Sequence, residues 1–300
     1  MSSRMGHWID HTPMCPRDCL VKHHELVLAL SSSSMSTAEL DCCIQVQVKR
    51  GWDVDSDIPD PLPNLQRPIL YLAASFCFIR VLRYLLERFQ LKAAVQSSKG
   101  ESALHGMIKH AYHTLRTSRP DCRRKIEAVT KMLQTLTNHD PKILLVKDYT
   151  DNQTPLLFTA QLFVDLENTS SDSRRKRIPP QENFYAGCIE AILQNISNLY
   201  EKGNISKDEL SEALITSDSK GCNVLHVLAQ STHEKARVIF RRVVDLMNVV
   251  SNETEVLFLK NNAGKTVTDL VLEHRPQHAT AWLSKLNYED EGKRNKVFVF

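Results

Sequence analysis

The sequence predicts an all-α fold in which about five degenerate helical repeats stack into an elongated solenoid. Three observations lead to this prediction. A short motif with a central Leu recurs along the 300 residues, and an amphipathic helix follows most of its copies. The composition, 42% hydrophobic and 24% charged, is that of a chain able to bury a core.

The first copy of the motif covers residues 68–74, which read PILYLAA. The small Ala pair allows a neighbouring helix to approach closely. Residues 75–86 continue as SFCFIRVLRYLL, with paired aliphatic residues four positions apart that predict the buried stripe of a second helix. Taken alone, the second half fits one amphipathic helix of a bundle equally well.

Later copies decide against a bundle. Residues 100–105 read GESALH, 151–156 read DNQTPL, 218–229 read DSKGCNVLHVLA, and 262–270 read NAGKTVTDL. Leu104 follows Leu70 by 104 − 70 = 34 positions. Second helices are predicted over 125–136, 187–196 and 238–247, where aliphatic residues recur at helical spacing.

These copies resemble the ankyrin repeat, whose pattern is T-P-L-H-x-A-A, a short turn and then V-V-x-x-L-L. The resemblance covers roughly residues 60–285. It implies hairpin turns built on Asp or Asn and Gly, a capping Thr or Ser, and Pro in the first turn of the first helix. It also implies that His105 and His226 hydrogen-bond between neighbouring loops, and that the copy at 262–270, with Asp for His, ends the array.

The spacing departs from a regular ankyrin array after the second copy. The intervals lengthen to 156 − 104 = 52 and 225 − 156 = 69 residues. Residues 114–123 and 167–182 are therefore predicted as polar loops, and Ser206 to Ile215 as an added capped helix. The interval 156–225 is interpreted as an insertion, although an eroded further repeat would also fill it.

We expect three regions: a flexible N-terminal region over 1–60, a repeat domain over 61–285 and a tail over 286–300. No signal peptide is recognised near the start, so reduced thiols in cytoplasm or nucleus are expected. No membrane span is predicted, because Arg80 and Arg83 interrupt the most apolar stretch, 69–86.

We expect no catalytic residues, no cofactor and no metal, and hence no enzyme. Residues 264–266 (GKT) lack the earlier glycine of a phosphate-binding loop. The N-terminal region contains soft ligands at four-residue spacing, but two prolines interrupt any helix that would align them for zinc. These ligands are His7, His11, Cys15, Cys19 and His23.

Exposed residues that the repeat does not require are the expected protein-binding residues. On the predicted hairpin tips these are Asp148, Tyr149, Ser219, Lys220, Asn261 and Asn262. The basic run Arg174, Arg175, Lys176 and Arg177 resembles a nuclear import signal or a site for an acidic partner, while a solvated loop explains it equally well. The net charge of +3 argues against direct binding of nucleic acid.

Within the ankyrin class, the favoured hypothesis is a regulator similar to the inhibitors of NF-kappa-B, monomeric on its own, with a Rel-type transcription factor as partner. It rests on the repeats, the acidic segment ahead of them and the basic run. Residues 55–60 (DSDIPD) faintly resemble the phosphodegron of those inhibitors. Alternatives are a ubiquitin-ligase substrate adaptor, a cytoskeletal or membrane-protein scaffold, and an enzyme with a pocket between the inserted loops.

Overall fold

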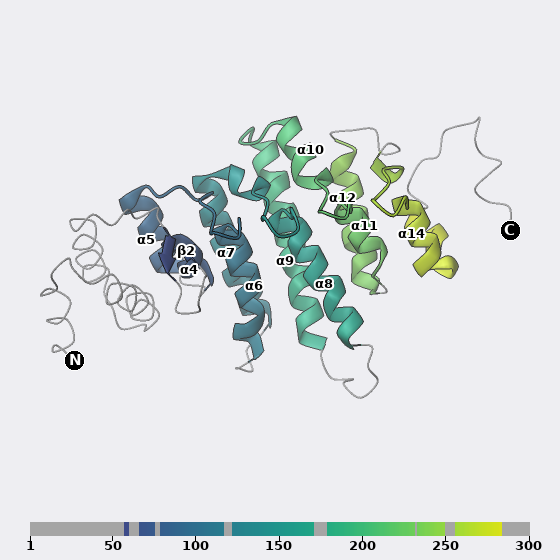
Figure 1. Ribbon diagram of the computed structural model, residues 1–300, viewed down its shortest axis with the longest axis horizontal. Helices are drawn as coiled ribbons and strands as arrows, with labels where there is room; N and C mark the ends of the chain where they lie inside the picture. Colours follow the sequence, from purple (N-terminus) through teal and green to yellow (C-terminus); the bar gives the residue numbers. More distant parts are fainter. Residues whose placement is uncertain are drawn as a thin grey trace, which may run out of the picture.

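Helix pairs stand side by side in an elongated row in the computed structural model (Figure 1). The structure describes residues 57–59, 66–75, 79–116, 122–170, 179–231, 233–249 and 256–283. The predicted N-terminal region, apart from residues 57–59, and the predicted tail lie outside the described residues, so the predicted domain boundaries stay predictions. The all-α repeat solenoid is confirmed.

Five helix pairs follow one another among the described residues. They are α4 (Ile69–Ser75) with α5 (Ile79–Phe89), α6 (Ala103–Arg116) with α7 (Cys122–His139), α8 (Pro155–Ser170) with α9 (Pro179–Glu201), α11 (Val224–Ala229) with α12 (Glu234–Met247), and α14 (Val267–His274) with α15 (Ala279–Leu283). Two short strands, β1 (Asp57–Pro59) and β2 (Gln66–Pro68), pair antiparallel ahead of α4. Two 3₁₀ turns, η2 (Pro141–Leu145) and η3 (Pro276–His278), and the single helix α10 (Lys207–Ile215) complete the description.

Two of the first helices begin at a side-chain cap, which is the expected Thr at α14 and an Asn in place of the expected Thr or Ser at α11. Asn223 caps α11 and Thr266 caps α14, each with a side-chain oxygen that accepts a backbone N–H of the first turn. Pro155 occupies the first position of α8, where its missing N–H leaves no hydrogen bond unmade.

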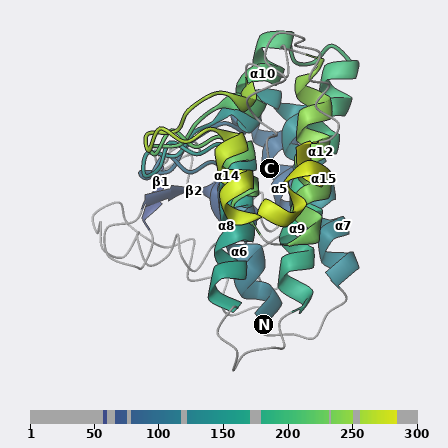
Figure 2. The same cartoon turned by 90° about the vertical axis from the view of Figure 1, so that its right-hand side faces the viewer.

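The helices form two layers. The inner layer, α4, α6, α8, α11 and α14, lies on the side from which the loops project, and α5, α7, α9 and α12 lie behind it (Figure 2). The central Leu of the first four motifs is buried in the core between the layers: Leu70, Leu104, Leu156 and Leu225. In the last motif, where Asp269 stands for the His, half-buried Thr268 takes the Leu position and the buried Leu270 follows. The repeat pattern therefore marks the residues that hold consecutive pairs together.

Both predicted polar loops are shorter than expected, which corrects the boundaries 114–123 and 167–182. Helix α6 continues to Arg116 and α7 begins at Cys122, while α8 continues to Ser170 and α9 begins at Pro179. Polar composition suggested loops, but the exposed end of a long helix has the same composition. Residues 117–121 and 171–178 lie outside the described residues.

The added capped helix is confirmed as α10. The hydroxyl oxygen of Ser206 accepts the N–H of Glu209, and the Glu209 carboxylate accepts the N–H of Ser206. Helix α10 packs on α9, α12 and η2. The described part of 156–225 thus holds one helix pair and one extra helix, which agrees with an insertion. No helix among the described residues is both long enough and apolar enough to cross a bilayer.

Candidate protein-binding surface

Four hairpins connect the helix pairs and project together to one side of the inner helices (Figure 2). We define them as hairpin 1 (Ser97–Glu101), hairpin 2 (Asp148–Gln153), hairpin 3 (Asp218–Cys222) and hairpin 4 (Asn261–Lys265). In each, the first N–H donates to the last carbonyl, over 2.9, 3.0, 2.9 and 3.0 Å respectively. We call the four together the hairpin row.

The turns of hairpins 2, 3 and 4 are fixed by their first side chain. Oδ1 of Asp148 accepts the N–H of Asp151, at 2.8 Å. Oδ1 of Asp218 accepts the N–H groups of Lys220 and Cys222, at 2.9 and 2.8 Å. Oδ1 of Asn261 likewise accepts two backbone N–H groups of hairpin 4. These side chains point back into their own turns, as Asx residues commonly do.

Backbone hydrogen bonds join each hairpin to the next. The N–H of Tyr149 donates to the carbonyl of Lys99 at 2.8 Å. The N–H of Ser219 donates to the carbonyl of Asp151 at 2.7 Å, and the N–H of Asn262 to the carbonyl of Lys220 at 2.9 Å. Hairpins that are remote in sequence therefore form one continuous, hydrogen-bonded row.

Left-handed residues make this close stacking possible. Gly100 and Gly221 have φ values of +75° and +73°, and a Cβ at either would lie under 3.0 Å from the next hairpin. At Gly100 the contact is the ring and backbone of Tyr149; at Gly221 it is Asn262. In hairpin 2, Asn152 takes this position with φ +60°, and its Nδ2 donates to the carbonyl of Ser217.

Two histidines bind the inner helices to these loops, which confirms their predicted structural role. Nε2 of His105 donates to the carbonyl of Gln153 at 3.0 Å, and its Nδ1 accepts the N–H of Ser102. Nε2 of His226 donates to the carbonyl of Leu259, two residues ahead of hairpin 4, at 3.0 Å. Burial lowers the pKa of both imidazoles, so the neutral form predominates near neutral pH.

Comparison with known proteins gives similarity at the level of structure. No family model matches the sequence, and no curated protein matches it. An ankyrin-repeat protein, EF0377, aligns with 87% of this chain and 96% of its own, at 14% identity and a TM-score of 0.50. The fold is an ankyrin-repeat solenoid.

Two further solved structures align at lower scores. One is a chain of the complex between the predatory endopeptidase Bd0816 of Bdellovibrio bacteriovorus and the immunity protein Bd3460, with 15% identity, 87% and 96% coverage and a TM-score of 0.48. The other is the ankyrin repeat domain of Bcl-3, a member of the IkappaB protein family, with 15% identity, 86% and 97% coverage and a TM-score of 0.38. Similarity at these identities concerns the fold alone.

The first, third and last ankyrin units replace the motif His, the last of them with Asp269. In the first, Tyr71 donates its hydroxyl to Oε2 of Glu101 at 2.8 Å, so it bridges α4 to the next hairpin as a His would. Burial acts to raise the pKa of Glu101, but hydrogen bonds from Lys109, at 2.5 Å, and from Tyr71 outweigh it and lower that pKa. In the third unit, Leu157 stands at the position of the motif His. It is buried and has no polar group to make the bridge.

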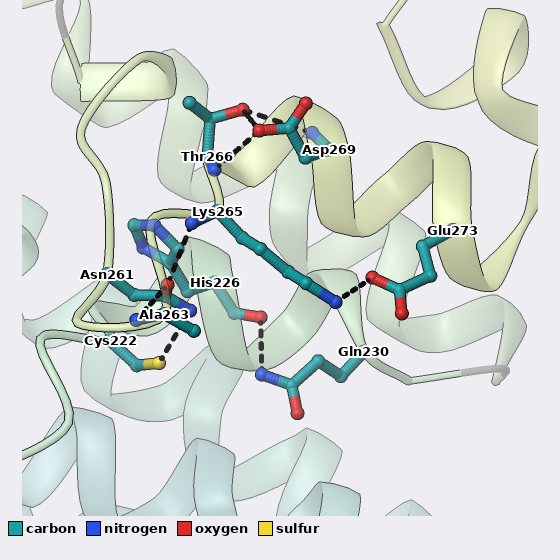
Figure 3. A network of polar contacts seen from close by, with 9 residues as sticks. All are labelled: Cys222, His226, Gln230, Asn261, Ala263, Lys265, Thr266, Asp269 and Glu273. Atoms are coloured by element: carbon teal, nitrogen blue, oxygen red, sulfur yellow. Dashed lines mark hydrogen bonds and ion pairs between the residues drawn. The ribbon is translucent and has the colours of Figure 1, made fainter.

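The last hairpin shows how residues with catalytic potential are used structurally (Figure 3). Lys265 pairs with Glu273, and Thr266 caps α14 together with Asp269, so the GKT sequence belongs to a hairpin and a helix start. Burial raises the pKa of the Cys222 thiol, whose sulfur lies 3.5 Å from Nδ2 of Asn261. A protonated, buried thiol is a poor nucleophile.

The structure places all six predicted tip residues in the hairpin row. Tyr149, Ser219, Lys220 and Asn262 are exposed, whereas Asp148 is buried and Asn261 half-buried, with their side chains bonded within their turns. Whether any of them binds a partner stays a prediction. Arg174, Arg175, Lys176 and Arg177 lie outside the described residues.

Sequence reasoning did not single out Lys99, on the tip of hairpin 1. The sequence SSKG at 97–100 carries the same Lys-Gly turn as 218–221 and could have revealed it. Among the residues that the structure describes, no three His, Cys, Asp or Glu side chains gather closely enough to hold a metal ion.

Proposed function

We propose that this chain is a protein-interaction scaffold that binds and controls a signalling or transcription factor. The observation that supports this proposal best is the hairpin row. Its exposed side chains come from four loops separated by many residues, yet backbone hydrogen bonds fix the loops against one another. Ankyrin-type solenoids use such extended surfaces to bind other macromolecules.

A fixed row favours binding because little conformational entropy remains to be lost. A flexible loop must be ordered when a partner binds, and the free energy of ordering reduces the affinity. Here the turns are closed internally by Asp148, Asp218 and Asn261, and the bridging histidines fix the row to the inner helices. The exposed groups are therefore presented in a preorganised array.

A binding role without catalysis is part of the proposal. The most deeply buried titratable groups beside the hairpin row, His105, His226 and Glu101, have their hydrogen-bonding atoms engaged by neighbouring repeats or caps. A general acid or base must instead present a free atom to a substrate. These groups support the fold rather than a reaction.

The narrower hypothesis is a regulator similar to the inhibitors of NF-kappa-B, acting in cytoplasm or nucleus on a Rel-type factor. Its support comes from the sequence: an acidic segment precedes the repeats, and a basic run lies between α8 and α9. Fold alone does not select this partner over others.

The experiment is affinity purification of the tagged full chain from cells, followed by mass spectrometry, with variants that block the hairpin row. Thr150→Trp with Ser219→Trp adds bulk at two exposed tip positions, and Glu127→Trp with Lys131→Trp adds the same bulk on the exposed face of α7. We expect a partner captured by the wild type and the α7 variant and lost with the row variant. Equal capture by both variants would reject the hairpin row as the binding surface.

The same experiment decides the narrower hypothesis. A Rel-type factor among the partners that require an unblocked row supports it. Row-dependent partners without any Rel-type factor reject it and leave the scaffold function in place.

A further inference from the structure

The most exposed large hydrophobic side chain among the described residues is Tyr149, at 70%. Despite this exposure, several contacts hold it in place. Its ring packs against Gly100, its N–H donates to the carbonyl of Lys99, and its hydroxyl lies 3.4 Å from Oε1 of Gln96. Tyrosine is enriched among the residues that contribute most to protein binding, and a ring already held in place supplies contact area at low entropic cost.

The support under this tyrosine is itself fixed. Nε2 of Gln96 donates to the carbonyls of Gly100 and Lys147, each at 2.8 Å, so the amide joins hairpin 1 to the residue directly before hairpin 2. Its oxygen is thereby aimed at the tyrosine hydroxyl. The side chain of Tyr149 therefore loses little rotamer freedom when a partner covers it.

The charges around Tyr149 differ in how they are used. The carboxylates of Asp148 and Asp218 are buried and bonded to backbone N–H groups of their own turns. Lys99 and Lys220 are exposed, and neither has an ion-pair partner in the part of the chain that the structure describes. The one tip carboxylate that is only half-buried, Asp151, lies 3.5 Å from the Ser219 hydroxyl. The unpaired exposed charges of hairpins 1 to 3 are therefore mainly positive.

We infer that the hairpin row binds an acidic protein segment, with Tyr149 inserted into an apolar pocket of the partner and partner carboxylates opposite Lys99 and Lys220. This inference rests on the proposed scaffold function and specifies its partner class. Burying the ring provides most of the affinity, while the two ammonium groups select for acidic residues and orient them.

Single-stranded nucleic acid is the other ligand that a tyrosine and lysines attract, since bases stack on aromatic rings. The hairpin row fits it less well. Nucleic-acid binding draws on a groove of several cations along the backbone, whereas these three hairpins offer two, with Asp151 between them. We therefore assign the row to an acidic protein segment.

The probe is a random 16-residue peptide library displayed on phage and selected against the folded full chain. We expect the enriched peptides to contain an excess of Asp and Glu together with apolar residues. Their affinity for the soluble chain is then measured by fluorescence anisotropy. Tyr149→Ala should weaken binding at least about tenfold, and Tyr149→Phe much less, because the ring remains.

Charge reversal tests the second half of the inference. Lys99→Glu with Lys220→Glu should weaken the same peptides several-fold and reduce the salt dependence of binding. Lys131→Glu, a matched reversal at an exposed position of α7, should leave affinity unchanged. Circular dichroism melting curves verify that every variant remains folded.

Three results would overturn the inference. They are enriched peptides with no excess of acidic residues, peptides that bind Tyr149→Ala as tightly as wild type, and a labelled oligo-dT that binds more tightly than any peptide and is lost in Tyr149→Ala. Failure of this inference can be told apart from failure of the proposed scaffold function. If a cellular partner is lost with the tryptophan-blocked row but retained by Tyr149→Ala, the scaffold role stands and this inference is wrong.

Discussion

Nε2 of His105 lies 3.0 Å from the carbonyl oxygen of Gln153, and this one bond joins inner helix α6 to hairpin 2 of the following repeat. Both groups are buried, so neither has water as a replacement partner. The bond therefore couples neighbouring repeats and fixes the base of the hairpin that carries Tyr149.

We expect His105→Ala to lower the free energy of unfolding by about 1–3 kcal/mol, because the carbonyl of Gln153 and the capping groups of Ser102 lose their partner. Urea denaturation at pH 7.5 measures this change. His274→Ala, at an exposed position near the end of α14, is the control and should change stability little. Equal effects of the two substitutions would contradict the bridging role.

Stability should also fall as the pH drops below about 6.5, the ordinary pKa of histidine. Burial lowers the pKa of His105 and His226 in the folded chain, so the unfolded chain binds more protons in this range. Their contribution is complete above the ordinary pKa and is lost as the pH falls toward the lowered one. The pKa of Glu101 is also lowered. Its effect on stability falls in a separate pH range, near the ordinary pKa of a glutamate carboxyl group, about 4.3.

The measurement is the urea midpoint at several pH values between 7.5 and 5. We expect the midpoint of the wild type to fall over this range. His105→Gln with His226→Gln should flatten the dependence, and His274→Gln should leave it as in the wild type. A pH dependence that persists in the double variant would assign it to other groups.

Much of the fold could be predicted from the sequence because the repeat places a few obligatory residues in fixed order. The central leucines identified the core, Thr266 marked the start of α14, and His105 and His226 were correctly interpreted as structural. The helix ends at Arg116 and Ser170 could not be predicted, because polar residues occur both in loops and at the exposed end of a helix.

The candidate surface was predictable only in part. The hairpin tips followed from the Asx and Gly residues, but the sequence does not tell which tip side chains turn inward. Asp148 looked like a surface residue, yet its carboxylate is directed at backbone N–H groups of its own turn. Seating Tyr149 on Gly100 requires two hairpins to stack, and this contact between residues 49 positions apart has no local signal.

The basic run gives a prediction that depends on the sequence alone. Changing Arg174, Arg175, Lys176 and Arg177 to Ala should shift a fluorescently tagged full chain from nucleus to cytoplasm if the run acts as an import signal. The control for the loss of positive charge changes four exposed lysines that are far apart in the sequence to Ala: Lys92, Lys131, Lys202 and Lys235. An unchanged distribution would support the interpretation of the run as a solvated loop.

Two glycines at the same turn position test whether hairpin stacking stabilises the array. Gly221 and Gly264 both have φ +73°, so an alanine at either suffers a similar strain from a Cβ in the left-handed region, about 1–2 kcal/mol. Only at Gly221 does the new Cβ meet a following hairpin, at 2.7 Å from Oδ1 of Asn262 and 2.9 Å from its backbone nitrogen; at Gly264 no atom lies within 4 Å. We therefore expect Gly221→Ala to destabilise the chain by about 1–3 kcal/mol more than Gly264→Ala, because hairpin 4 must move away and lose its bond to the carbonyl of Lys220.

Urea denaturation of both variants measures the difference, and faster amide exchange at Asn262 in the Gly221 variant alone would locate it at the junction. Equal destabilisation would mean that the hairpins stack without contributing to stability, and the preorganisation on which the binding surface depends would then have to come from the helices alone.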